Sequence, residues 1–212
     1  MNVMSSSASL LHTGVRQLEL SLPEGAEARL LAYLSLLSKW NRVHNLTAVR
    51  DEQQMVSHHL LDSLTVLPYL SGYATLADVG SGGGLPGIPL ALARPDMAVT
   101  LVEANHKKAS FLQQAKIELG LSNVNIHCGR VENYTPTVLF DAVISRAFSE
   151  LALFIRVAGH LCAHNAPLLA MKGVDPQEEI AQLPNGWRVA QTQVLHVPGL
   201  DAQRHLLTIL RN

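Results

Sequence analysis

The chain has 212 residues, of which 48% are hydrophobic and 16% are charged, so an intrinsically disordered protein is excluded and one domain with an extension fits. Its formal net charge of -1 gives no general basic surplus, so binding to nucleic acid would need a local cluster of basic residues. Cys128 and Cys162 lie far apart, and no signal peptide or membrane-spanning stretch is recognisable. We therefore expect a cytoplasmic protein with buried thiols rather than disulfides.

The N-terminal part of the chain has the patterns of helices and no run typical of a strand. Apolar residues recur at helical spacing between Leu30 and Trp40, and a second helical pattern runs from about Asp51 to Leu67, where Pro68 follows. Two such helices bury too little surface to fold alone. We interpret residues 1–70 as a helical cap on a domain formed by residues 71–212.

Short apolar runs without polar alternation follow, as is typical of strands buried on both faces of a sheet. Helical segments separate most of them, which indicates parallel strands joined by right-handed crossovers. A short turn with Pro198 and Gly199 joins the last two, which predicts an antiparallel hairpin and an antiparallel strand at the end of the sheet. The runs are Thr75–Val79, Val99–Val102, Val124–His127, Ala142–Ile144, Pro167–Met171, Trp187–Val197 and His205–Leu210. The predicted fold class is α/β and Rossmann-like, with a mostly parallel seven-stranded sheet that ends in this hairpin.

A glycine-rich turn follows the first predicted strand directly. Four of the five residues from Gly80 to Gly84 are glycine, and a helical pattern begins after them. Glycine lets the backbone turn sharply and approach a ligand closely, since it has no Cβ. Doubly wound sheets bind ligands outside the carboxyl ends of their strands, so we expect a cofactor at this turn.

The turn can be aligned in two registers. Gly82, Gly84 and Gly87 match the G-x-G-x-x-G fingerprint of dinucleotide binding, but the carboxylate of Asp78 would then lie near a pyrophosphate and repel it. In the other register, Asp78, Gly80, Gly82 and Gly84 match the pattern acidic-x-Gly-x-Gly-x-Gly. This register suits S-adenosylmethionine, whose sulfonium and ammonium groups attract a carboxylate. Glu103 ends the second predicted strand, where an acidic residue accepts hydrogen bonds from ribose hydroxyls of either cofactor. We therefore predict an S-adenosylmethionine site that includes Asp78, Gly80, Gly82 and Glu103.

Six sequence blocks together resemble the bacterial small-subunit rRNA guanine-N7 methyltransferases, RsmG, formerly called glucose-inhibited division protein B. The blocks are Trp40–Ala48, His59–Leu64, Asp78–Ala91, Lys107–Leu112, Ser145–Ala147 and Met171–Gly173. The resemblance covers nearly the whole chain from residue 30 onward, whereas the first 20 residues or so carry none. It implies a class I S-adenosylmethionine-dependent methyltransferase that modifies a guanine of 16S rRNA, its partner within the small ribosomal subunit.

The resemblance also implies five positions that line the cofactor pocket. Gly80 would allow close approach, and Leu85 would offer an apolar wall. Val131 and Glu132 would offer a backbone amide and a carboxylate to the adenine edge. Arg146 would pair with the methionine carboxylate of the cofactor or with an RNA phosphate.

The chemistry at guanine N7 asks for no catalytic acid or base. The N7 lone pair lies in the ring plane and attacks without losing a proton, so alignment with the methyl carbon can supply catalysis. Ile144–Ala147 contains neither an Asn/Asp-Pro-Pro-Tyr/Phe motif for an exocyclic amine nor a Pro-Cys pair for a pyrimidine carbon. His160, Cys162 and His164 would not share one helix face, so we expect no metal site.

Basic residues are predicted at the rim of the cofactor site. Lys107 and Lys108 begin the helix after the second strand, Lys172 follows the fifth strand and Arg204 begins the last one. If the last strand is antiparallel, its start lies at the edge where the parallel strands end. Lys172 and Arg204 would then converge with Arg146 near the transferred methyl group and hold RNA phosphates beside an unstacked base. We predict RNA binding at Lys107, Lys108, Lys172 and Arg204.

Two other functions remain open on the sequence alone. A small-molecule methyltransferase would use the same cofactor domain and would suit the nearly neutral charge. An NAD-dependent oxidoreductase would use the alternative glycine register. A non-catalytic RNA-binding module would leave the acidic residue before the glycine turn unexplained.

Overall fold

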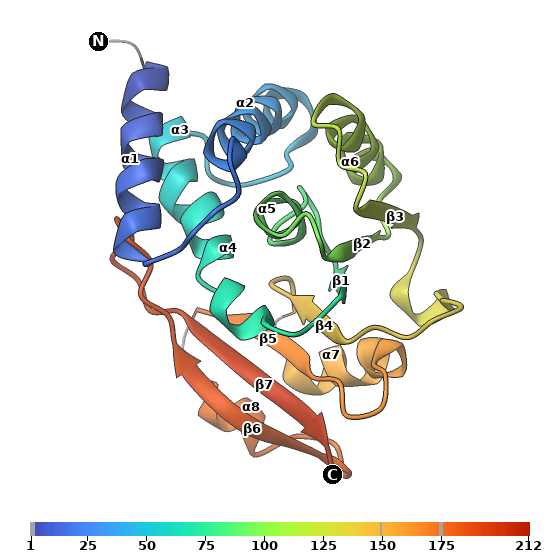
Figure 1. Cartoon of the computed structure of the whole chain (residues 1–212). Helices are drawn as coiled ribbons and strands as arrows, with labels where there is room; N and C mark the ends of the chain where they lie inside the picture. The colour runs from blue at the N-terminus through green and yellow to red at the C-terminus, as the bar shows by residue number, and fades with distance from the viewer. Residues whose placement is uncertain (1–2, 149, 174–175) are drawn as a thin grey trace.

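A seven-stranded β-sheet forms the centre of the computed structural model, which describes residues 3–148, 150–173 and 176–212 (Figure 1). The strands lie in the order β3-β2-β1-β4-β5-β7-β6. They are β1 (Thr75–Val79), β2 (Ala98–Glu103), β3 (Val124–Cys128), β4 (Ala142–Ser145), β5 (Leu168–Lys172), β6 (Trp187–Val194) and β7 (His205–Arg211). Each lies within a few residues of a predicted run.

The first five strands pair in parallel, and β7 runs antiparallel to both β5 and β6. The predicted class of fold is therefore confirmed. The antiparallel strand is not the edge of the sheet, however, because β7 lies between β5 and β6. Leu206, Leu207 and Ile209 make β7 apolar on both faces, as an inner strand requires, whereas exposed residues dominate the edge strand β6.

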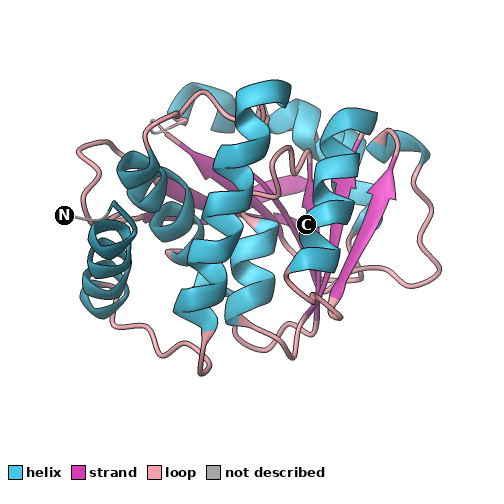
Figure 2. Ribbon diagram, turned by 90° about the horizontal axis from the view of Figure 1, so that it is seen from above, coloured by secondary structure: helices cyan, strands magenta, loops and turns pink. Residues whose placement is uncertain are grey.

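Helices cover both faces of the sheet (Figures 1 and 2). The α-helices are α1 (Val3–Gln17), α2 (Ala26–His44), α3 (Glu52–Met55), α4 (Asp62–Leu64), α5 (Gly87–Ala93), α6 (His106–Glu118), α7 (Leu151–Ala158) and α8 (Gln177–Ile180). A π-helix spans Val56–Leu61, and 3-10 helices span Leu67–Leu70, Val131–Asn133 and Gly159–Leu161. No helix in the described part of the chain is long and apolar enough to cross a bilayer.

Alternate residues of β1 face two separate hydrophobic clusters. Leu76 belongs to a cluster that includes Leu37 of α2 and Ile88 of α5, whereas Ala77 packs in a second cluster with Phe154 of α7. Residues of α1 also belong to the first cluster. The N-terminal helices and one face of the sheet therefore share a single core.

The helical segment between Asp51 and Leu67 differs from the regular helix that its pattern predicts. It consists of α3, a π turn at Val56–Leu61 and α4, and Pro68 lies inside the next 3-10 helix. The π turn ends where the backbone N–H of Asp62 donates to the carbonyl groups of Ser57 and His59. Such turns are rare and frequently occur at functional sites.

Candidate cofactor and nucleic-acid site

The glycine turn after β1 has a backbone that requires glycine at particular positions. The φ angles of Gly80, Gly82 and Gly84 are 72°, 57° and 89°, in the left-handed region. A Cβ on Gly80 would lie 3.0 Å from the Cβ of Ala147, and one on Gly84 would lie 2.5 Å from the side chain of Ile88. The turn therefore stays close to its neighbours and free of side chains.

A cavity of about 240 Å³ opens beside this turn, at the carboxyl ends of β1 and β4. Four of the residues predicted for the cofactor site line it, namely Gly80, Gly82, Leu85 and Arg146. Leu46 and Thr47, from the loop after α2, form another part of the wall. The N-terminal helical segment thus completes a pocket that the sheet begins.

Glu103 connects the end of β2 to the glycine turn. Its Oε2 accepts a hydrogen bond of 2.8 Å from the backbone N–H of Gly82, and its Oε1 accepts one of 2.8 Å from Asn105. Each carboxylate oxygen has a second lone pair, so the group can still accept hydrogen bonds from two hydroxyls of a ribose. Glu103 is buried and does not line the cavity, so its contact with a ribose stays a prediction.

Asp78 lies beneath the turn and does not line the cavity. Its Oδ2 accepts a hydrogen bond of 2.8 Å from the backbone N–H of Gly87, while its Oδ1 is buried and has no hydrogen-bond partner among the described residues. Burial raises the pKa of this carboxyl to about 7. A cation bound above the turn would favour the ionised form, so the unpartnered oxygen fits a positively charged cofactor through its field and not through contact.

Besides Asp78 and Glu103, four predicted residues line neither this cavity nor the next one described. Val131 is buried and Glu132 is exposed in the 3-10 helix that follows β3. Lys107 and Lys108 begin α6, where their backbone N–H groups donate to the side chain of Asn105. Their predicted contacts with adenine and with RNA stay predictions.

A second cavity, of about 340 Å³, brings three predicted basic residues together. Arg146, Lys172 and Arg204 all line it, with Val49 and Met171 among the apolar residues of its wall. The antiparallel register of β5 and β7 explains the meeting, because Lys172 pairs with the residue after Arg204. Arg146 lines both cavities and therefore lies between them.

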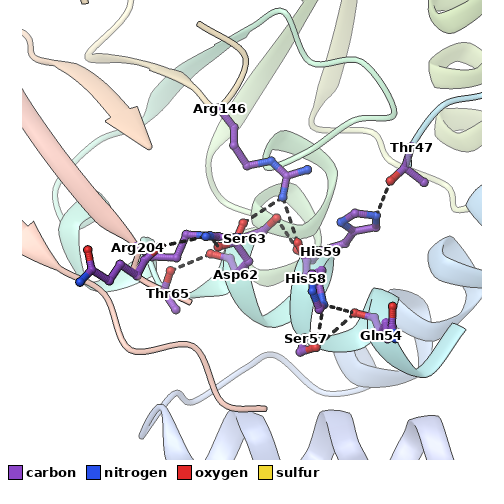
Figure 3. Close-up of polar contacts among 11 residues, drawn as sticks. Thr47, Gln54, Ser57, His58, His59, Asp62, Ser63, Thr65, Arg146 and Arg204 are labelled. Carbon is purple, nitrogen blue, oxygen red and sulfur yellow. Dashed lines mark hydrogen bonds and ion pairs between the residues drawn. The ribbon is translucent and has the colours of Figure 1, made fainter. Parts of the chain in front are cut away.

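A buried carboxylate holds two of these cations (Figure 3). Asp62 has a side chain that is 1% exposed, and it accepts a 2.9 Å hydrogen bond from Nη1 of Arg146 and another of 2.9 Å from Nε of Arg204. Nη1 of Arg146 also donates to the carbonyl oxygen of His58, at 3.1 Å. The sequence favours a packing role for Asp62, which lies three residues after His59 in the block His59–Leu64.

Lys172 has a different environment from the two arginines. Its Nζ lies 2.7 Å from a carboxylate oxygen of Glu179 in α8 and donates to the carbonyl oxygen of Phe148 at 3.4 Å. The other oxygen of Glu179 accepts a hydrogen bond from the backbone N–H of Leu151 at the start of α7. Lys172 therefore links β5 to α8 and, through Glu179, to the start of α7, as well as lining the cavity.

His59 and Thr47 form part of the partition between the two cavities. Nε2 of His59 lies 2.8 Å from Oγ1 of Thr47; His59 lines the second cavity and Thr47 the first. Burial, with the positive charge of Arg146, lowers the pKa of His59 to about 4. The imidazole is therefore neutral at physiological pH.

The fold is similar to solved methyltransferases of low sequence identity. The O-methyltransferase TomG from Streptomyces achromogenes, solved in complex with SAM, has a TM-score of 0.60 and 18% identity over 95% of this chain and 96% of that chain. An O-methyltransferase from Bacillus cereus, solved in complex with SAH, has a TM-score of 0.58 and 18% identity over 85% of this chain and 91% of that chain. The architecture is that of the class I methyltransferases.

Curated relatives match the chain over nearly its whole length. The ribosomal RNA small subunit methyltransferase G of Aromatoleum aromaticum is 59% identical over 210 residues, which cover 97% of this chain and all of that protein. A protein of the same name from Neisseria meningitidis is 54% identical over 199 residues, 94% of this chain and 96% of that protein. The family model GidB, described as rRNA small subunit methyltransferase G, matches residues 26–207. The chain belongs to this family.

Proposed function

We propose that this chain transfers a methyl group from S-adenosylmethionine to N7 of a guanine in 16S rRNA, within the small ribosomal subunit. The observation that carries the proposal is the junction at Arg146, where a glycine-lined cavity meets a cavity rich in basic groups. Family membership supports methyl transfer to rRNA of the small subunit. Such a substrate would place the enzyme in the cytoplasm.

The residues around the glycine turn suit the cofactor. Gly80 and Gly82 leave room for it, Leu85 offers an apolar wall and Glu103 can accept its ribose hydroxyls. When bound, S-adenosylmethionine supplies a methyl group on a positively charged sulfur. The buried carboxylate of Asp78 favours that charge through its field. We assign Val131 and Glu132, which lie in the 3-10 helix after β3, to binding of the adenine end of the cofactor.

The groups around the second cavity suit binding and alignment rather than proton transfer. His59 is neutral and already hydrogen-bonded to Thr47, and Asp62 is held by two guanidinium groups. Attack by N7 releases no proton from the base, so neither group has to accept one. Alignment of reacting groups can lower a barrier by up to about 7–11 kcal/mol, which makes it sufficient as the main source of catalysis.

The basic residues of the second cavity suit the phosphates of an RNA strand. In the described residues, Nη2 of Arg146 and Nη2 of Arg204 have no protein acceptor, so each guanidinium keeps a donor for an anion. Val49 and Met171 offer apolar surface to an unstacked base. We assign Lys172 to the same site and Lys107 and Lys108 to a more distant stretch of RNA.

Methyl transfer to isolated subunits tests the proposal. Small ribosomal subunits from a strain that lacks this activity are incubated with the protein and tritiated S-adenosylmethionine, in parallel with a metabolite extract. We expect tritium in 16S rRNA. We expect none when the subunits come from a strain in which this guanine of the 16S rRNA is already methylated. Label confined to small molecules would instead identify a small-molecule methyltransferase.

A further inference from the structure

Asp62 joins three distant segments of the chain at the boundary between the two cavities. It begins α4, while Arg146 follows β4 and Arg204 precedes β7 (Figure 3). Its two carboxylate oxygens are divided between the partners, Oδ2 to Arg146 and Oδ1 to Arg204. The side chain of Asp62 is 1% exposed, whereas those of Arg146 and Arg204 are 27% and 24% exposed. All three residues line the second cavity, but the carboxylate is almost completely buried, whereas both arginine side chains are partly exposed.

The charges of this cluster do not cancel. Asp62 supplies one negative charge against two guanidinium groups, so a net positive charge faces the cavity that both arginines line. The charge of Lys172, by contrast, is balanced by Glu179. This net positive charge suits an anion. The buried carboxylate fixes its position, because it holds both guanidinium groups.

Each guanidinium is fixed by a second acceptor besides Asp62. Nη1 of Arg146 donates to the carbonyl oxygen of His58 in the π turn, and Nη1 of Arg204 donates to that of Gln203, both within 3.1 Å. Long arginine side chains lose rotamer freedom when they bind a ligand, and a side chain that is already held loses less. The cluster is therefore organised before any ligand arrives.

We propose that Asp62 is a positioning residue for RNA: it holds Arg146 and Arg204 at a fixed separation so that their remaining donors meet a phosphate beside the target guanine. The inference rests on the proposed function. Buried ion pairs are weak evidence for a stabilising role, because desolvation offsets much of their attraction. A role in organising the two arginines instead explains why a carboxylate is buried where two cations meet.

A double-mutant cycle with Asp62→Asn and Arg204→Ala tests this role. The readouts are kcat and KM for small-subunit methylation, the Kd of S-adenosylhomocysteine and the melting temperature. We expect Asp62→Asn to lower kcat/KM for the subunit by about 10–100-fold, mainly through KM, with the cofactor Kd within about threefold. Because both changes act on the same guanidinium, the double variant should lose at least about fivefold less than the product of the single losses.

The alternatives give different results. A purely structural role lowers the folded fraction, so kcat falls at an unchanged KM and the losses multiply; this result overturns the inference. Asp96→Asn is the matched control, since Asp96 pairs with Arg94 at 2.8 Å on the surface and should have no effect. Arg204→Lys keeps the charge but not the planar donor fork, and it should raise KM at least about fivefold even if Asp62→Asn does not fold.

The wild-type protein separates this inference from the proposed function. If it transfers no methyl group to the subunit, the proposed function fails and the inference fails with it. If it is active and neither Asp62→Asn nor Arg204→Lys changes KM, only the inference is overturned.

Discussion

The backbone N–H of Gly82 donates to Oε2 of Glu103 at 2.8 Å, which links the middle of the glycine turn to the end of the neighbouring strand. Glu103 is buried and also accepts a hydrogen bond from Asn105, so it fixes both the turn and the start of α6. One carboxylate thus shapes the place where the ribose of the cofactor is expected.

The substitution Glu103→Gln tests that link. Glutamine keeps the size of the side chain but replaces one acceptor oxygen with a donor, so one of the two backbone N–H groups loses its acceptor. We expect the Kd of S-adenosylhomocysteine, measured by calorimetry, to rise about tenfold. Glu118→Gln, at an exposed position of α6, is the control. Equal Kd values for wild type, Glu103→Gln and Glu118→Gln would contradict the assignment of Glu103 to the cofactor site.

Gly80→Ala should lower cofactor affinity as well as stability. At φ 72° the new Cβ is strained by about 1–2 kcal/mol, and it lies 3.0 Å from Ala147 at the wall of the first cavity. Gly120→Ala is a matched control, because Gly120 has φ 59° with nothing within 4 Å of the added Cβ. Both variants should melt at a lower temperature, but only Gly80→Ala should weaken binding of S-adenosylhomocysteine. Similar losses of binding in both would show that strain alone is responsible.

Asp78 should make folding stability depend on pH in a defined direction. Its pKa is raised from 3.8 to about 7 in the folded chain, so the unfolded chain releases this proton first as the pH rises. This carboxyl therefore lowers stability progressively between about pH 4 and pH 7, by up to about 4 kcal/mol, and has no effect below that window.

The variant Asp78→Asn isolates this effect in urea unfolding. It lacks the ionisation, so its free energy of unfolding relative to wild type should be higher at pH 8 than at pH 5. Asp96→Asn should show no such change, because Arg94 lowers the pKa of Asp96 and that carboxyl is ionised at both values. A pH-independent difference for Asp78→Asn would mean that Asp78 titrates normally.

Arg204→Ala and Lys172→Ala should both weaken methylation of the subunit but differ in their cost to folding. We expect Arg204→Ala to lower kcat/KM about tenfold while the Kd of S-adenosylhomocysteine stays nearly unchanged. Lys172→Ala should have a smaller effect on RNA and a larger one on melting temperature, because it leaves Glu179 without its cation. Lys39→Ala, exposed on α2, is the control. Loss of cofactor binding in Arg204→Ala would count against an RNA-binding role.

The sheet could be predicted closely because its strands have local signals. Thr75–Val79 was predicted with the bounds that β1 has, since an apolar run that ends at a glycine turn is visible in a few residues. The antiparallel last strand was enough to predict that Arg146, Lys172 and Arg204 meet, and all three line the second cavity. Their binding of RNA stays a prediction.

Other features depend on contacts that local patterns do not contain. Asp62 pairs with arginines 84 and 142 residues away, so helical spacing gives no sign of its role. The apolar residues of the π turn at Val56–Leu61 follow a pattern that a regular helix can also have, so the pattern does not distinguish the two kinds of helix. The pattern of β1 also gives no sign that Asp78 is covered: the sequence predicts Asp78 in the cofactor site, and the structure buries its carboxyl beneath the turn, outside the cavity lining.

Mapping the modified base tests the central claim most directly. Small subunits from a strain lacking the activity are treated with the protein and S-adenosylmethionine, and their 16S rRNA is cleaved with aniline at N7-methylated guanines. We predict one new cleavage site, at a guanine, that needs both the protein and the cofactor. If tritium from labelled S-adenosylmethionine enters the rRNA without any new cleavage, the account is contradicted, because the methyl group then lies on an atom other than guanine N7.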